Sequence, residues 1–405
     1  MMIYTPATPY EVQKHDVLYS STTCYQVLDF SGEGSFGKVG KCINLTTGSH
    51  VAVKIHKDDG NVPEVIRKEI HMLKAIRTLD PDKNNIVNFM EDFMFNNLSC
   101  LAFEMLDRSL WDLMEERRWI PLNLNEIRPV THQLMVAFDA LKSIGIIHTD
   151  LKPDNIMLVN QNDQPFKIKL IDFGLARRVS EVRIGTIMQP SSFRAPEVTL
   201  GLPLTEAVDM WGVGCIMAFL YFGRELFPRE CSYNLIRSMV HLLGQPEDDL
   251  LSAGLYSWAY FSLNEDPYNP GFRLRSPEEF TQVTGIQTQI MFTFLDFVED
   301  LQDAAEREAP QNISRDDDCE DECNKQQESI PNAEPFEPTK EAEVPEEMPS
   351  EQQETTSPAP ALESQQAAEG NLPQKTAEPP SVWRRVRHFL GLRKPKRWKR
   401  RREEE

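Results

Sequence analysis

The order of apolar and polar positions divides the chain into a part with strand patterns and a later part with helical patterns. Val51, Val53 and Ile55 alternate with other residues, which predicts a half-buried strand. Residues 98–103 are a second strand candidate. Between them, residues 64–78 carry apolar side chains at the spacing of one helix face. A sheet accompanied by one helix is therefore expected in the first hundred residues.

Helical spacing prevails further along the chain. One apolar stripe consists of Val130, Leu134, Phe138 and Leu141. Residues 207–222 are apolar nearly all round, as in a buried helix. Strand patterns followed by helical patterns predict an α+β fold with two lobes.

No segment is expected to send the chain through a membrane. The longest near-apolar run, residues 212–223, is shorter than the roughly 20 residues that cross a bilayer. The N-terminus lacks the basic and apolar regions of a secretory signal. The seven cysteines are odd in number and show no framework spacing, which favours reduced thiols. The expected location is the nucleus, the cytoplasm or both.

Composition changes sharply after about residue 302. Residues 303–380 hold 11 of the 28 prolines and a single aromatic residue. Such a segment buries too little apolar surface to offset its ordering entropy, so we expect it to be disordered. The net charge of −20 argues against a general nucleic-acid coat, but residues 381–405 alone carry a net charge of +8.

This basic tail allows several interpretations. It fits a signal that binds import receptors, a helix that lies on an anionic membrane surface, or a nucleic-acid contact. It also fits a solvated end that rests on the acidic segment before it.

A glycine-rich motif at Gly32, Gly34 and Gly37 allows three phosphate-binding interpretations besides a simple turn. It fits the dinucleotide fingerprint, nearly fits a P-loop, and fits the kinase loop GxGxxGxV. A P-loop needs a hydroxyl where Val39 stands, and no βαβ repeat follows Gly37. The kinase interpretation is therefore favoured, provided that later residues agree.

Lys54 and Glu69 agree with it. Lys54 lies on the strand that follows the glycine motif, as in VAIK. Glu69 shares the apolar helix face of Ile66 and Leu73, where an unpaired charge is costly. We expect the two side chains to pair, with Lys54 held against the α- and β-phosphates of ATP.

The sequence from His148 to Asn155, HTDLKPDN, matches the kinase catalytic loop HxDLxxxN. In this frame Asp150 accepts the proton of the substrate hydroxyl, Lys152 offsets charge on the transferred phosphoryl group, and Asn155 binds Mg²⁺. Asp172 of the DFG motif at 172–174 is a second Mg²⁺ ligand. An APE motif follows at 195–197.

These motifs together predict a bilobal protein-kinase fold, with an antiparallel β N-lobe that holds one helix and a mostly helical C-lobe. The chain resembles the kinase group that includes the cyclin-dependent and mitogen-activated kinases. More narrowly, it resembles the homeodomain-interacting protein kinases. Four segments carry this resemblance, namely KCINLTTGSHVAVKI, LAFEMLDRSLWDLM, LKSIGIIHTDLKPDNIMLV and LGLPLTEAVDMWGVGCIMAFLYFG.

The resemblance implies a kinase domain over residues 20–302, with an N-lobe at about 20–106 and a C-lobe at about 107–302. It implies ATP and Mg²⁺ as cofactors, and transfer to Ser or Thr, often before proline. Phe103 is expected at the back of the ATP pocket, and the backbone of Glu104, Met105 and Leu106 is expected to hold adenine. The full set of expected ATP-binding residues is Gly32, Gly34, Gly37, Val39, Ala52, Lys54, Glu69, Phe103, Glu104 and Leu106.

Several positions depart from the family pattern. Ile187 stands where the family has an activation-segment tyrosine, and Thr149 replaces the arginine that grips a phosphorylated segment. Ser191 replaces an arginine that shapes the pocket after the phosphosite, which leaves the proline preference open. The family's final C-lobe helices are not recognisable after about residue 300. Glu197 is therefore expected to lack its arginine partner.

Two functional hypotheses follow. The first is an active serine/threonine kinase that acts on proteins, with transcription regulators among the candidate substrates. The alternative is an ATP-binding scaffold with little turnover. Neither requires direct nucleic-acid binding by the kinase domain.

Overall fold

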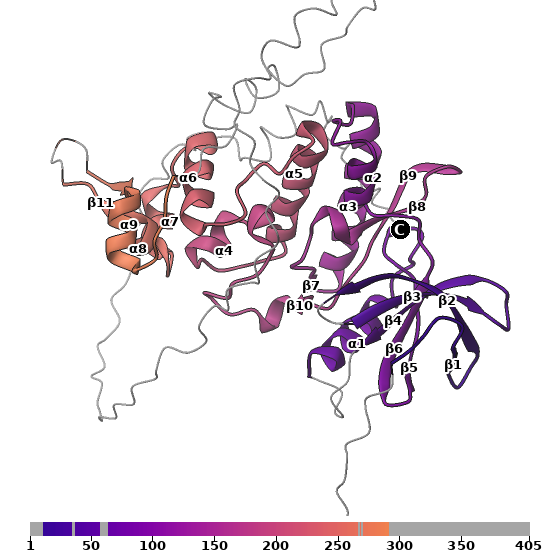
Figure 1. Ribbon diagram of the computed structural model, residues 1–405. Coiled ribbons are helices and arrows are strands. Elements are labelled where there is room, and N and C mark those ends of the chain that lie inside the picture. The colour runs from indigo at the N-terminus through magenta and orange to yellow at the C-terminus, as the bar shows by residue number, and fades with distance from the viewer. Residues whose placement is uncertain (1–10, 35–36, 57–63, 266–267, 269, 291–405) are drawn as a thin grey trace, which may run out of the picture. The chain divides into compact units, whose positions relative to one another are not determined.

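The computed structural model describes residues 11–34, 37–56, 64–265, 268 and 270–290, and the account below is limited to them. They form an N-terminal lobe built on one sheet and a C-terminal lobe built mainly of helices (Figure 1). The predicted α+β architecture of two lobes is confirmed. The predicted disordered segment and the basic tail lie outside the described residues. Among the described helices, none is both long and apolar enough to span a bilayer.

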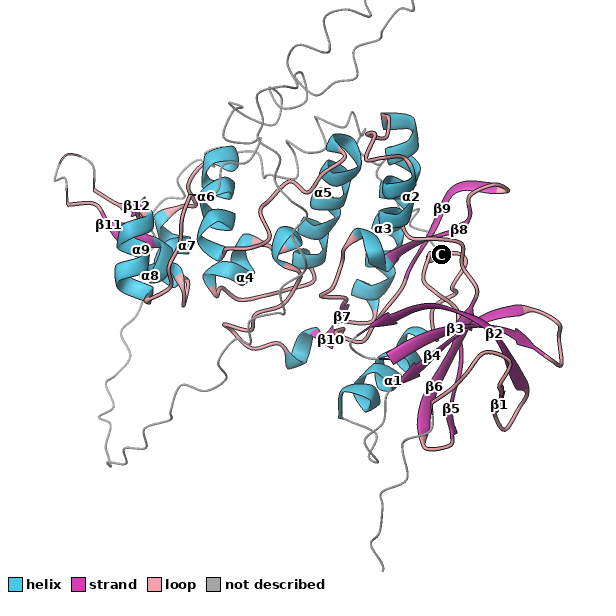
Figure 2. Ribbon diagram, in the orientation of Figure 1, coloured by secondary structure: helices cyan, strands magenta, loops and turns pink. Residues whose placement is uncertain are grey.

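The N-lobe sheet has six antiparallel strands in the order β1-β2-β3-β4-β6-β5. Its strands are β1 (Val17–Tyr19), β2 (Cys24–Gly34), β3 (Gly37–Asn44), β4 (His50–His56), β5 (Phe89–Phe95) and β6 (Leu98–Glu104). The helix α1 (Glu64–Ile76) follows β4 and precedes β5 in the chain. Figure 2 shows this one helix beside the strands.

The period-two pattern of β4 sorts its side chains between two environments. Val51, Val53 and Ile55 are buried in a core that occupies one face of the sheet. Lys54 lies on the other face, and it is opposite Val39 on β3 and Leu101 on β6. This alternation separates the core around Val51, Val53 and Ile55 from the face of Lys54, where Leu101 is buried in a second apolar cluster.

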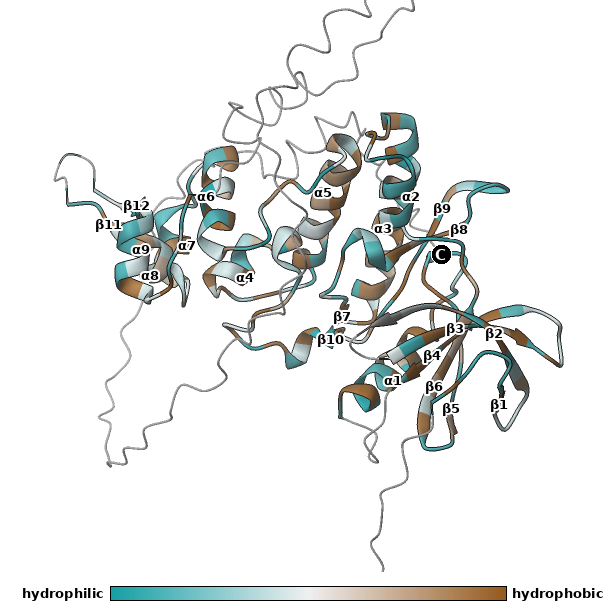
Figure 3. Cartoon of the chain, in the orientation of Figure 1, coloured by the Kyte–Doolittle hydropathy of each residue, from teal (hydrophilic) through white to brown (hydrophobic). Residues whose placement is uncertain are grey.

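The C-lobe is organised around α3 (Leu124–Ser143) and α5 (Ala207–Phe222), which pack against one another. Helix α5 is apolar on nearly every side, and Figure 3 shows it mainly in brown and white shades. The predicted bounds of this helix, 207–222, are confirmed. The other helices are α2 (Leu110–Glu116), α4 (Pro196–Leu200), α6 (Ser232–Leu243), α7 (Asp248–Ala253), α8 (Ser257–Tyr260) and α9 (Pro277–Thr284).

Three pairs of short antiparallel strands complete the described part of the C-lobe. They are β7 (Ile146–Ile147) with β10 (Arg177–Arg178), β8 (Ile156–Asn160) with β9 (Gln164–Leu170), and β11 (Phe261–Leu263) with β12 (Phe272–Leu274). The 3₁₀ turn η1 (Pro153–Asn155) lies between β7 and β8. The catalytic loop and the DFG motif are therefore each anchored by short strands. The five described cysteines are free thiols.

Candidate active site

An ion pair links the sheet of the N-lobe to α1. The Nζ of Lys54 lies 2.7 Å from Oε1 of Glu69 and 3.4 Å from Oδ1 of Asp172. Glu69 is buried because its helix face packs inward with Ile66 and Leu73. The predicted pair is present, and it brings the DFG aspartate within reach of the strand lysine.

The electrostatics of this cluster keep its members charged. Burial acts to raise the pKa of Glu69, but the hydrogen bond from His56 and the charge of Lys54 outweigh it and lower that pKa. Burial likewise opposes the charge of Lys54, yet Asp172 and Glu69 together raise the pKa of Lys54. A lysine that stays protonated next to two carboxylates is suited to bind phosphate oxygens.

The catalytic loop holds Asp150 in a network of hydrogen bonds. Nδ2 of Asn155 donates to Oδ2 of Asp150 at 2.8 Å and also to its backbone carbonyl at 2.8 Å. Nζ of Lys152 lies 3.4 Å from the same Oδ2. Within the described part of the chain, Oδ1 of Asp150 has no hydrogen-bond partner and is free to accept a proton.

A carboxylate on α5 accepts hydrogen bonds from the backbone of this loop. Asp209 accepts hydrogen bonds from the backbone N–H of His148 at 2.7 Å and of Thr149 at 3.1 Å. The His148 ring in turn accepts from the N–H of Asp150 at Nδ1, and its Nε2 lies 2.9 Å from the carbonyl of Ile171. The loop and the DFG segment are thus tied to each other and to the most buried helix of the lobe.

The glycine motif lies in the β2–β3 hairpin, where register places its residues on the face that carries Lys54. Gly32 is opposite Val39, and Gly34 is opposite Gly37. Gly37 has a φ of +146°, and a Cβ there would stand 2.1 Å from the carbonyl oxygen of Ile55. Only glycine therefore fits position 37, because β3 and β4 approach each other too closely for a side chain.

The segment after β6 offers backbone groups where adenine is expected. Ala52 and Phe103 are register partners on β4 and β6, on the same face as Lys54. The side chain of Glu104 is committed elsewhere, since it accepts from Lys169 Nζ at 2.6 Å and from the N–H of Asn88 at 2.6 Å. The backbone N–H and C=O of Leu106 make no hydrogen bond to any described residue, so they are available to a base.

Asp172 and Asn155 fit a magnesium ion by their chemistry. No cluster of three or more His, Cys, Asp or Glu residues with metal-binding geometry occurs among the described residues. A carboxylate and an amide oxygen suit Mg²⁺, which commonly completes its shell with water and substrate phosphates. The Nδ2 of Asn155 is engaged with Asp150, which leaves its Oδ1 to face a cation.

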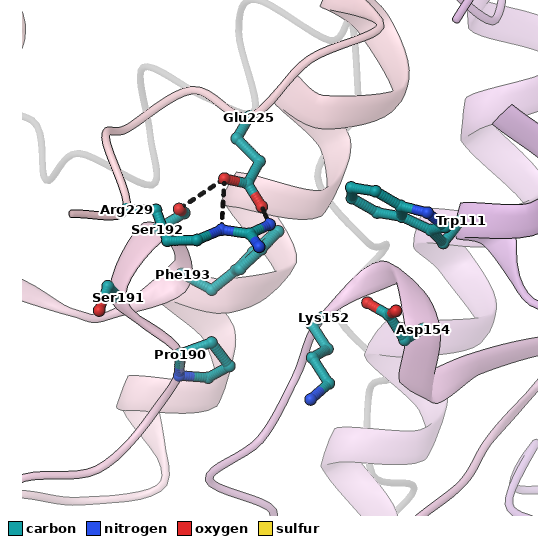
Figure 4. A pocket seen from close by; sticks show the side chains of 9 residues that line it. All are labelled: Trp111, Lys152, Asp154, Pro190, Ser191, Ser192, Phe193, Glu225 and Arg229. Carbon is teal, nitrogen blue, oxygen red and sulfur yellow. Dashed lines mark hydrogen bonds and ion pairs between the residues drawn. The ribbon is translucent and has the colours of Figure 1, made fainter. Parts of the chain in front are cut away.

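A cavity of about 290 Å³ adjoins the catalytic loop. Lys152 and Asp154 line it from that loop, and Glu225 joins Ser192 and Arg229 within it (Figure 4). Oγ of Ser192 donates to Glu225 at 2.7 Å. The remaining lining residues are Trp111, Pro190, Ser191, Phe193. The cavity begins at the lysine that contacts Asp150, so a side chain of a bound polypeptide could enter it.

The sequence profile of the protein kinase domain matches residues 25–253. The chain belongs to the protein kinase family. It is 41% identical over 280 residues to homeodomain-interacting protein kinase 2 of Mesocricetus auratus, and 40% identical over 280 residues to homeodomain-interacting protein kinase 1 of Mus musculus. It is 38% identical over 274 residues to homeodomain-interacting protein kinase 4 of Homo sapiens. The resemblance inferred from the motifs is thereby confirmed.

The similarity covers part of each protein. The aligned residues make up 69%, 69% and 67% of this chain. They make up 24%, 23% and 44% of the three relatives, in the same order. The chain therefore spans less than half the length of these relatives.

Hydrogen bonds to backbone carbonyls hold the activation segment. Oγ1 of Thr149 donates to the carbonyl of Leu175 at 2.7 Å, in the place where the family has an arginine. The hydroxyl of Tyr256 donates to the carbonyl of Gly185 at 2.8 Å. The guanidinium of Arg194 donates to the carbonyl of Gln189 at 2.9 Å. Ile187, at the tyrosine position, is half exposed.

Sequence reasoning missed three polar residues around the site. His56 contacts Glu69, Lys169 contacts Glu104, and Tyr256 contacts the activation segment. A signal existed for His56 alone, because it lies two residues after Lys54 and so shares the face of the strand. The other two contacts join segments that are 65 and 71 residues apart.

Glu197 of the APE motif has the expected environment. Burial raises its pKa, and the described residues supply no ion-pair partner for it. The neighbouring α5 residue Trp211 has a buried indole N–H that no described residue accepts. Among the residues that the structure describes, neither of these two groups has a polar partner.

We predict that Glu197→Gln stabilises the kinase at neutral pH. A raised carboxyl pKa means that stability from this group is present at low pH and is lost as pH rises through the folded-state pKa. The neutral amide removes that loss, so melting temperature at pH 7.5 should rise, on the order of 2 °C. The difference should vanish near pH 4, as a melting series across that range checks. A lower melting temperature at pH 7.5 would reveal a cationic partner beyond the described residues.

Proposed function

We propose that this chain transfers the γ-phosphoryl group of Mg-ATP to serine or threonine hydroxyls of protein substrates. The observation that carries the proposal is the closed Lys54–Glu69 pair at 2.7 Å, with Asp172 within 3.4 Å of the same lysine. Protein kinases need this pair and the DFG aspartate in place together. The scaffold hypothesis is not favoured, because no polar group of this set is missing.

Each residue of the site has its own role in phosphoryl transfer. Lys54 holds phosphate oxygens, and the backbone around Leu106 holds the base. When bound, Mg²⁺ neutralises charge on the phosphates, and Asp172 and Asn155 hold it. Asp150 accepts the hydroxyl proton at Oδ1 while its Oδ2 stays bonded to Asn155. Lys152, next to Asp150, offsets the charge of the phosphoryl group as it moves to the substrate oxygen.

The direct test is transfer of labelled phosphate from Mg-ATP to a generic protein and to the chain itself. Phosphoamino-acid analysis should find phosphoserine or phosphothreonine. A folded, ATP-binding protein that transfers no label would contradict the proposal.

We also predict that Asp172→Asn weakens the magnesium-dependent part of nucleotide binding. Ligand that binds only the folded state adds about 2.7 kcal/mol of stability at 100 times its Kd. The wild type should therefore melt at a higher temperature with Mg-ATP than with ATP and a chelator. This difference should be small in Asp172→Asn, while the exposed-site variant Asp139→Asn should keep it. An equal magnesium effect in all three proteins would argue against Asp172 as a ligand.

The names of the relatives guide the choice of substrate. They are kinases named for interaction with homeodomain proteins, so we propose transcription regulators in the nucleus as substrates to test first. Phosphorylation of a purified homeodomain protein at a rate no greater than that of a generic substrate would count against this choice.

A further inference from the structure

His56 is a buried residue that none of the kinase motifs uses. It ends β4, two residues after Lys54, and it is 1% exposed. Its Nε2 lies 3.2 Å from Oε2 of Glu69, and its Nδ1 lies 3.3 Å from the carbonyl oxygen of Ser99 on β6. The imidazole therefore joins α1 to the middle of the sheet.

The two oxygens of Glu69 are divided between two donors. Oε1 faces Lys54 at 2.7 Å, and Oε2 faces His56 at 3.2 Å. Gly174 of the DFG motif lies beside this carboxylate, since a Cβ built there would stand 3.6 Å from Oε2, an ordinary contact distance. The orientation of the carboxylate, and so the direction in which it draws Lys54, depends on both donors.

Lys54 has a competing partner. Asp172 lies 3.4 Å from its Nζ on the side of the C-lobe. If Oε2 of Glu69 lost its donor, the carboxylate would rotate to seek another one, since a buried acceptor without a partner is costly. Lys54 would then shift towards Asp172, away from the position in which it meets phosphate.

We propose that His56 is a positioning residue for ATP, which fixes the Glu69 carboxylate so that Lys54 stays aligned with the phosphates. This inference rests on the proposed function and deepens it. Glu69 on α1 is the charged group that contacts the ring, and Glu69 is in turn paired with Lys54, which also lies near Asp172 after β9. On the other side of the ring, Nδ1 lies 3.3 Å from the carbonyl oxygen of Ser99 on β6.

The test compares two substitutions at this position. His56→Leu introduces an apolar side chain of similar size that has no donor, and His56→Gln keeps an N–H donor. We expect His56→Leu to lower kcat/KM for ATP about tenfold, the scale of one hydrogen bond to a charged group. The KM for the protein substrate should stay unchanged, and His56→Gln should recover most of the loss. His50→Leu is the matched control, because His50 is exposed at the other end of the same strand.

A second measurement separates positioning from a general loss of folding. In a Glu69→Ala background, His56→Leu should leave the affinity for Mg-ATP unchanged, because the carboxylate that it positions is gone. A merely structural role predicts that His56→Leu lowers the total activity by the same factor in both backgrounds. The cause would then be a lower folded fraction, and the KM values would stay unaltered. That result, or a His56→Leu enzyme with normal kcat/KM for ATP, overturns the inference.

The outcomes also distinguish this inference from the proposed function. A wild type that transfers phosphate while His56→Leu behaves normally leaves the function standing and removes the role of His56. A wild type that binds Mg-ATP without transfer removes the function, and the effect of His56→Leu on nucleotide affinity still decides the inference. A wild type that binds no Mg-ATP overturns both.

Discussion

Asp150→Asn should reduce phosphoryl transfer by about 10²- to 10⁴-fold, the usual contribution of a general base. The amide has nearly the shape of the carboxylate but accepts no proton at neutral pH. Nδ2 of Asn155, which now donates to Asp150 at 2.8 Å, still finds an acceptor oxygen in the variant. The loop should therefore keep its shape, and the loss should lie in the chemical step.

The measurement is single-turnover transfer from Mg-ATP, with melting temperature and nucleotide affinity recorded for the same preparations. Both should match the wild type within error. Asp139→Asn is the control, because it makes the same chemical change on an exposed position of α3. Transfer by Asp150→Asn within tenfold of the wild type would exclude Asp150 as the base.

Asp209→Ala should destabilise the C-lobe by roughly 2–5 kcal/mol, because it leaves two buried N–H groups without their acceptor. Those groups belong to His148 and Thr149, whose bonds to Asp209 measure 2.7 and 3.1 Å. The free energy of unfolding of the variant and of the wild type is measured by denaturant titration. Asp139→Ala, a truncation at an exposed helix position, should change stability by no more than about 0.5 kcal/mol.

The deficit should also depend on pH. Burial raises the pKa of Asp209 from 3.8 to about 6. A raised carboxyl pKa adds stability that is full below the unfolded-state value and is lost as pH rises through the folded-state value. Asp209→Ala lacks this contribution, so its deficit should be larger at pH 5 than at pH 7.5, by about 1 kcal/mol. A deficit that grows towards pH 7.5 would show that the charged form is the one that the fold favours.

The sequence was sufficient to predict those helices and strands whose apolar residues recur with a regular local spacing. The period of two in β4 placed Lys54 on the face opposite Val53, and the helical spacing of α1 placed Glu69 inward. Their ion pair could then be predicted, because an inward carboxylate needs a cation nearby. The apolar character of residues 207–222 likewise gave the bounds of α5.

Other features depended on contacts that no local pattern encodes. Asp209 accepts a hydrogen bond from the N–H of His148, which lies 61 residues before it in the chain. Lys169 donates to Glu104, which lies 65 residues before it. Hydropathy tells which face of an element is buried, but not which polar groups meet inside. Each such pairing is selected because a buried donor or acceptor must be satisfied by whatever the packed lobes place beside it.

The sequence by itself therefore determined the family, the two lobes and the residues expected at the chemistry, because these follow from residue order and periodicity. The tertiary structure alone decided what holds those residues in place: Asp209 under the catalytic loop, Tyr256 on the activation segment and His56 behind Glu69. The reason is that hydrogen-bond geometry is fixed only when distant segments pack and exclude water from the groups between them.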